Sequence, residues 1–80
     1  MNLSILLFGV ARDIVGDKVI DLTLPDHENV EGLMEKIKEQ YPRFGELKSL
    51  LIAVNDEYAT KEKILNPNDE IALIPPVSGG

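Results

Sequence analysis

The sequence contains no cysteine and no tryptophan, and it has a single histidine, His27. Without cysteine the chain can form no disulfide, no thiolate metal site and no thiol nucleophile. His27 stands between Asp26 and Glu28, with no second histidine at ligand spacing. We therefore interpret His27 as a surface residue and expect no metal site.

Basic residues are scarce as well, since 8 lysines and arginines stand against 14 aspartates and glutamates, for a net charge of −6. The acidic excess runs through both halves of the chain, so there is no basic stripe. Binding to nucleic acid or to an anionic membrane surface needs clustered lysine and arginine. Neither partner is expected, and a protein partner with a basic docking surface fits better.

Long hydrophobic runs are also absent. The apolar run 3–8 is shorter than a signal-peptide core and follows no Lys- or Arg-rich segment, and no stretch approaches the length of a membrane span. We therefore expect a cytoplasmic protein. Eighty residues, of which 44% are hydrophobic, suit a single globular domain.

Apolar residues predict strands over 2–8 and 19–24, joined by a loop through 15–17 and paired as a hairpin. The inward positions of the two strands are Leu3, Ile5, Leu7, Ile20, Leu22 and Leu24. Strand 2–8 carries Leu6 and Phe8 on its other face.

A helix is predicted to begin after the N-cap Asn29 and to stop at Pro42. Its apolar stripe consists of Val30, Leu33, Met34, Ile37 and Tyr41. Residues 43–50 lack a clear period and are compatible with an irregular turn of helix. Strands follow over 51–55, which turns at Asp56–Glu57 and resumes near Tyr58, and over 70–74, after a turn signal at 66–69.

This order of elements predicts an α+β fold, a β-grasp (ubiquitin-like) roll in which one main helix packs on one face of a mixed sheet of four to five strands. The strands 2–8 and 70–74 are apolar on both faces, so we expect them to be neighbours in mid-sheet. The domain is expected over 1–74, with an extended, flexible tail over 75–80.

The tail is the most informative segment. It consists of Pro75, Pro76, Val77, Ser78, Gly79 and Gly80. The prolines favour a stiff extended stalk, and the two glycines make a thin tip that can enter a narrow channel. A carboxylate at that tip can attack the α-phosphate of ATP, and a sulfur donor can then displace AMP to leave a thiocarboxylate. A frayed, silent terminus is the alternative interpretation.

Three stretches resemble the small subunit of molybdopterin synthase, the MoaD family of ubiquitin-like β-grasp sulfur carriers. They are 7–16, with its aromatic, Arg-acidic and Gly pattern, the tripeptide 53–55, and 68–80 with its Pro-Pro-Val-Ser-Gly-Gly end. Leu73 and Ile74 depart from the pattern, because the family often has aromatic residues there.

The resemblance implies a sulfur-donating subunit that is not catalytic alone and binds no cofactor itself. An E1-like (MoeB-like) adenylating enzyme would use ATP to activate Gly80, and a sulfurtransferase system would supply the sulfur. A large (MoaE-like) synthase subunit would then take the thiocarboxylate to precursor Z, cyclic pyranopterin monophosphate, to build the molybdopterin dithiolene. Gly79 would give the tip its access.

Several residues are candidates for contact with these partners. Leu6, Phe8, Ala72 and Ile74 form either an exposed docking patch or the last part of a small core. Arg12 could pair with an acidic group of a partner or simply lie in a solvated loop. The full set of predicted partner-binding residues is Phe8, Arg12, Ile74, Pro75, Pro76, Val77 and Ser78.

Three rival functions stay open from the sequence. The chain could carry sulfur in another pathway, such as thiazole formation for thiamine, whose carriers share the fold and the Gly-Gly end. It could be a protein modifier whose activated Gly80 forms an isopeptide bond with a target lysine. It could also be a binding module with an inert tail.

Overall fold

The computed structural model describes residues 1–47 and 50–75. Within these residues the elements are β1 (Asn2–Leu7), α1 (Val10–Val15), β2 (Val19–Thr23), α2 (Val30–Gln40), the 3-10 helix η1 (Pro42–Glu46), β3 (Leu51–Val54), β4 (Glu57–Tyr58) and β5 (Ile71–Ile74). None of the described helices is long and apolar enough to cross a membrane.

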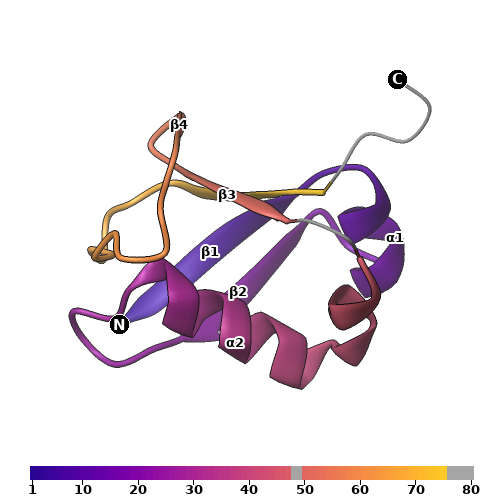
Figure 1. The fold of residues 1–80 in the computed structure, drawn as a ribbon, viewed down its shortest axis with the longest axis horizontal. Coiled ribbons are helices and arrows are strands. Elements are labelled where there is room, and N and C mark those ends of the chain that lie inside the picture. The colour runs from indigo at the N-terminus through magenta and orange to yellow at the C-terminus, as the bar shows by residue number, and fades with distance from the viewer. Residues whose placement is uncertain (48–49, 76–80) are drawn as a thin grey trace.

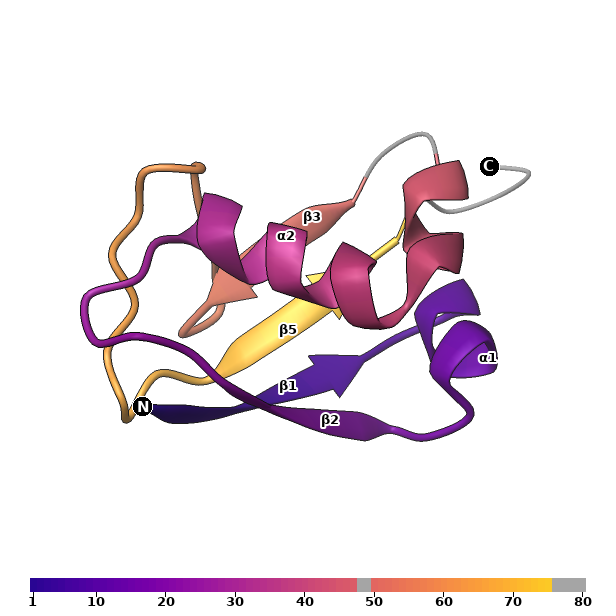
Figure 2. The ribbon, with the colours of Figure 1, turned by 90° about the horizontal axis from the view of Figure 1, so that it is seen from below.

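The strands form one mixed sheet in the order β2-β1-β5-β3-β4. Figure 2 shows β2, β1, β5 and β3 side by side. β1 and β5 pair in parallel at its centre, and every other pair is antiparallel. The predicted hairpin of the first two strands and the central pairing of the first and last strands are both confirmed. A mixed sheet with one main helix across it is the predicted β-grasp arrangement.

Helix α2 crosses one face of the sheet, and no element within the described residues covers the other face (Figures 1 and 2). Its N-cap is Asn29 as predicted, since the Asn29 Oδ1 accepts a hydrogen bond of 2.9 Å from the Gly32 backbone N–H. The core between helix and sheet includes Leu3, Ile5, Leu7, Ile20, Leu22, Leu24, Val30, Leu33, Ile37, Ile52, Val54, Ile71 and Leu73. These include every inward position predicted for β1 and β2.

Two local predictions need correction. The segment after β1 was expected to be a loop, but it contains α1, whose C-cap Gly16 adopts a left-handed φ of 84°. The turn after β3 lies one residue earlier than expected, because Asn55 and Asp56 both take positive φ, 53° and 69°, and connect Val54 directly to its partner Glu57. The irregular helical turn after Pro42 is η1.

Hydrogen bonds connect the turn after β3 to the turn that precedes β5. The Asn55 side chain donates a 3.0 Å hydrogen bond to Asp69 and accepts a 2.9 Å bond from the Glu70 backbone N–H. The Asn55 N–H donates to the Glu70 carbonyl at 2.8 Å. These bonds fix the start of β5, and the strand then runs across the sheet toward the C-terminal segment.

Candidate functional site

The uncovered face of the sheet carries a continuous apolar row from one edge to the other. Its residues pair successively across the five strands and are Val19, Leu6, Ala72, Ala53 and Tyr58. Leu6 is 47% exposed and Tyr58 69%, whereas the neighbouring core residues of β1, Ile5 and Leu7, are at most 3% exposed. The strand pairing therefore builds a hydrophobic stripe, which we call the open-face row. It is exposed at Val19, Leu6 and Tyr58, whereas Ala72 is half-buried and Ala53 is buried.

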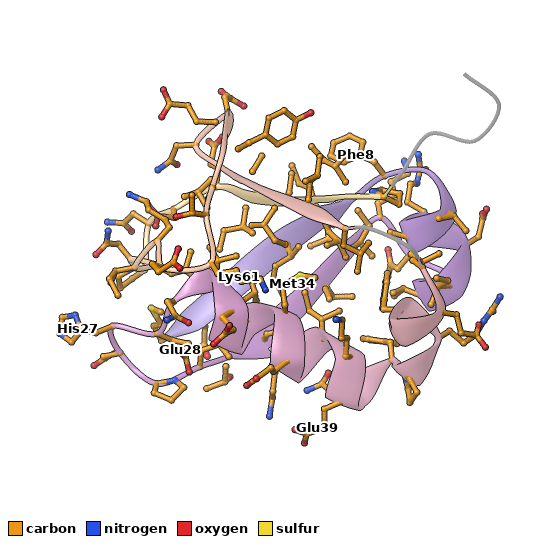
Figure 3. All side chains as sticks on the ribbon, viewed as in Figure 1. Phe8, His27, Glu28, Met34, Glu39 and Lys61 are labelled. Atoms are coloured by element: carbon orange, nitrogen blue, oxygen red, sulfur yellow. The ribbon has the colours of Figure 1, made fainter. Side chains whose placement is uncertain are left out.

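A second group of apolar side chains lies next to the open-face row, toward the end of the sheet where β1 and β5 stop. Leu51 pairs with Ile74, and the register that pairs Leu7 with Leu73 brings Phe8 beside Ile74. Leu51 and Phe8 are 49% and 47% exposed. Figure 3 shows Phe8 on the side of the sheet away from α2, so the Phe8 ring extends the apolar surface at this end.

The opposite end of the same face is polar and acidic. Asp21 pairs with Ser4, whose hydroxyl donates a 2.6 Å hydrogen bond to the Asp21 carboxylate. Ile5 pairs with Ile71 in the parallel register of β1 and β5, so the residues that precede them, Ser4 and Glu70, lie side by side. The open face is thus polarised along the strands, with hydrophobic side chains toward the C-terminal end of β5 and carboxylates at its beginning.

Pro75 follows β5 directly and is buried. It was expected to be the first residue of the extended tail, but it packs against the domain, where a Cβ added to Gly9 would lie 3.4 Å from the Pro75 Cγ. Pro75 is therefore the root of the C-terminal segment, held beside the residue that links β1 to α1. Its predicted contact with a partner stays a prediction.

The predicted site residues fall into three sets. Phe8, Ile74 and Pro75 gather at one end of the sheet, and Arg12 is exposed on α1, where its N–H donates a 3.1 Å bond to the Gly9 carbonyl. Arg12 also lines a surface hollow with Lys18. Pro76, Val77, Ser78, Gly79 and Gly80 lie outside the described residues.

His27 lies in the loop between β2 and α2, toward the opposite end of the molecule from Phe8 (Figure 3). It is exposed, and its backbone has a φ of 66°. Within residues 1–47 and 50–75, no cluster of three or more histidine, aspartate and glutamate residues is arranged to hold a metal ion.

Of the two alternatives for Leu6, Phe8, Ala72 and Ile74, the exposed surface holds for Leu6 and Phe8, while Ala72 and Ile74 are half-buried on the same face. That this surface docks a partner stays a prediction. The sequence prediction missed residues contributed by other strands, namely Val19, Leu51, Ala53 and Tyr58. For Val19, Leu51 and Ala53 the available signal was strand phase, because residues that alternate with the core positions of a strand must lie on the other face. Tyr58 lies in a two-residue strand without a core position, so phase could not place it.

Comparisons with known proteins agree on the family. The ThiS family model matches residues 5–80. The chain is 42% identical over 81 residues to the molybdopterin synthase sulfur carrier subunit of Dictyostelium discoideum, with 96% of this chain and 94% of the relative covered. The corresponding subunit of Arabidopsis thaliana is 32% identical over 81 residues, with 100% of this chain and 84% of the relative covered.

A solved structure has the same fold. It is that of a Pyrococcus furiosus protein described as subunit 1 of the molybdopterin converting factor, which superposes with a TM-score of 0.87 at 26% identity and covers 96% of this chain and 99% of that one. Because the family model matches most of the sequence and the relatives have this identity and coverage, the chain belongs to the ThiS/MoaD family of ubiquitin-like β-grasp proteins.

Proposed function

We propose that the chain is the sulfur carrier subunit of a molybdopterin synthase and bears its sulfur as a thiocarboxylate on Gly80. The observation that supports this role most directly is the position of the apolar surface. Phe8, Leu51 and Ile74 lie at the end of the sheet where β5 leads through Pro75 into the Gly-Gly segment. A partner that covers this surface would meet the C-terminal segment at the same place.

The chemistry needs only the terminal carboxylate of this chain. A carboxylate oxygen of Gly80 attacks the α-phosphorus of ATP and releases pyrophosphate, which gives an acyl adenylate. The terminal sulfur of a persulfide, R–S–SH, on a sulfurtransferase then attacks the acyl carbon, and AMP leaves to give an acyl disulfide. A second thiol attacks the R-bound sulfur of this acyl disulfide, which releases the thiocarboxylate and leaves a disulfide between R–S and that thiol. Glycine leaves the acyl carbon sterically open, because it has no Cβ beside the carbonyl.

The partners follow from the same scheme. An E1-like adenylating enzyme activates Gly80, and the large synthase subunit presents precursor Z to the thiocarboxylate. A dithiolene contains two sulfur atoms and each chain delivers one, so two chains that carry a thiocarboxylate are needed for each molybdopterin formed. The acidic residues Asp21 and Glu70 at the polar end of the open face favour a partner with basic side chains opposite them.

A reconstituted reaction tests the proposal. The chain is incubated with ATP, an E1-like adenylating enzyme, a sulfur source, the large synthase subunit and precursor Z, and molybdopterin is measured. We expect product that depends on every component. Sulfur transfer only to a thiazole-forming system would indicate the thiamine pathway, and chains covalently attached to lysines of other proteins would indicate a modifier.

The contact between the open face and the large subunit is tested by Phe8→Asp. A carboxylate buried in an apolar interface loses its hydration without a partner, so we expect the affinity for the large subunit to fall at least about tenfold. Phe8 is half-exposed and follows β1, so the domain should stay folded. The measurement is isothermal titration calorimetry together with circular dichroism.

Ile64→Asp is the matched control for this substitution. Ile64 is 45% exposed, close to the 47% of Phe8, but it forms an isolated β-bridge with Asn29 at the start of α2, away from the open-face row. The affinity of the Ile64→Asp chain for the large subunit should equal that of the unchanged chain. Equal affinity of the Phe8→Asp chain would show that the open face does not dock this partner.

A further inference from the structure

Gly9 occupies a backbone conformation that only glycine adopts readily. Its φ is 53° and its ψ is −132°, far from the regions open to residues with a Cβ. The conformation is held by the first turn of α1, in which the Phe8 carbonyl accepts a 3.0 Å hydrogen bond from the Ala11 N–H. The chain therefore turns out of β1 and into α1 sharply at Gly9.

The same residue lies at the root of the C-terminal segment. β1 and β5 are parallel and their last paired residues are Leu7 and Leu73, so both strands leave the sheet at the same end. Two residues further along each chain lie Gly9 and Pro75, where a Cβ on Gly9 would lie 3.4 Å from the Pro75 Cγ. The Gly9 backbone therefore lies close to the Pro75 ring. Pro75 is buried and its φ is fixed by that ring, so this part of the C-terminal segment is stiff.

We infer that Gly9 is a positioning residue for sulfur delivery, because it holds Pro75 at a fixed place beside the apolar surface of the open face. The inference rests on the proposed function and deepens it. A carrier that docks through its sheet while its C-terminal segment enters a partner is bound at two points. The C-terminal segment adds to the affinity of the complex only if the geometry allows the sheet and the C-terminal segment to bind the partner at the same time.

Gly9→Ala tests this role through a thermodynamic cycle. Alanine at this φ and ψ is strained, and relief of the strain requires the backbone beside Pro75 to move. The affinity for the large synthase subunit is measured by calorimetry for the full chain and for a chain without Gly79 and Gly80, each with and without Gly9→Ala. All described buried side chains precede residue 76, so both chains retain the core.

The expected result is coupling between the two changes. Loss of Gly79 and Gly80 should weaken binding of the unchanged chain, and in the Gly9→Ala background it should weaken binding about tenfold less, within the range found for residues that interact. A general loss of stability would not produce coupling of this kind, because it lowers the affinity of both chain lengths equally.

Gly16→Ala is the matched control. Gly16 ends α1, has a φ of 84°, and has nothing within 4 Å of an added Cβ. It thus imposes a positive-φ strain at the other end of the same helix without touching Pro75. No coupling is expected, and coupling equal to that of Gly9→Ala would overturn the assignment.

Pro75→Ala changes the other residue of the pair, Gly9 and Pro75. It tests the same role if the Gly9→Ala chain does not fold. It removes the Cγ next to Gly9 without any strain at positive φ, and it should also reduce the effect of deleting Gly79 and Gly80. Absence of coupling in either folded variant overturns the role of Gly9. If the deletion does not weaken binding of the unchanged chain at all, the proposed function itself fails, and this inference fails with it.

Discussion

Removal of Gly79 and Gly80 should abolish molybdopterin formation in the reconstituted reaction while leaving the domain folded. The reason is chemical, because the carboxylate that would be adenylated is no longer at the end of a thin Gly-Gly tip, and a serine side chain crowds the new terminus. The thermal unfolding midpoint should not change, since the described core residues all precede the deletion. Product analysis and calorimetry measure the two effects.

A chain whose Gly80 ends in a carboxamide, made by semisynthesis, separates the loss of the carboxylate from the loss of length. It has the full sequence but cannot form an acyl adenylate, so it should be as inactive as the deletion. Full activity of either chain would favour the rival in which the sheet surface acts alone and the terminus is inert.

Phe44→Ala should cause the largest loss of stability. Phe44 is fully buried in η1, and its ring meets that of Tyr41 edge to face, with centroids 6.1 Å apart and an interplanar angle of 89°. η1 packs against both α2 and α1, so the cavity cannot collapse easily. We expect the free energy of unfolding to fall by about 3–5 kcal/mol.

A loss of this size is a large part of the total, because a domain of this length typically has about 4–12 kcal/mol of stability. Urea unfolding measures it from the shift in the midpoint. Phe8→Ala is the control, since the same side chain is truncated at a half-exposed position and should cost less than half as much. A loss below about 1 kcal/mol for Phe44→Ala would contradict its place in the core.

The elements that the sequence predicts well are those with a repeating local signal. β2 alternates with period two through Ile20 and Leu22, and α2 has both an apolar stripe and the capping side chain of Asn29. Helix α1 was missed because it has only six residues, too few for a period, and the glycines at its two ends, Gly9 and Gly16, are also typical of loops. Phe44 lies in a stretch without any period, so only tertiary packing determines its burial.

The candidate site shows the same division. The exposure of Leu6 and Phe8 follows from the strand phase of β1, but Val19 and Tyr58 join them only through the register of other strands. The burial of Pro75 could not be predicted either, because it depends on the register of the parallel pair β1 and β5 and on the φ of Gly9. The sequence indicated that β1 and β5 are neighbours, but the register between distant segments leaves no mark in a single sequence.

The central claim is that Gly80 becomes a thiocarboxylate, and intact-protein mass spectrometry tests it most directly. The chain is incubated with ATP, an E1-like adenylating enzyme and a sulfur source, and its mass is measured. The mass of the C-terminal peptide is then measured after proteolysis. We predict a mass gain equal to the replacement of one oxygen by one sulfur, confined to that peptide and absent from the chain without Gly79 and Gly80. An unchanged mass, with the same adenylating enzyme active on a known carrier, would contradict the claim.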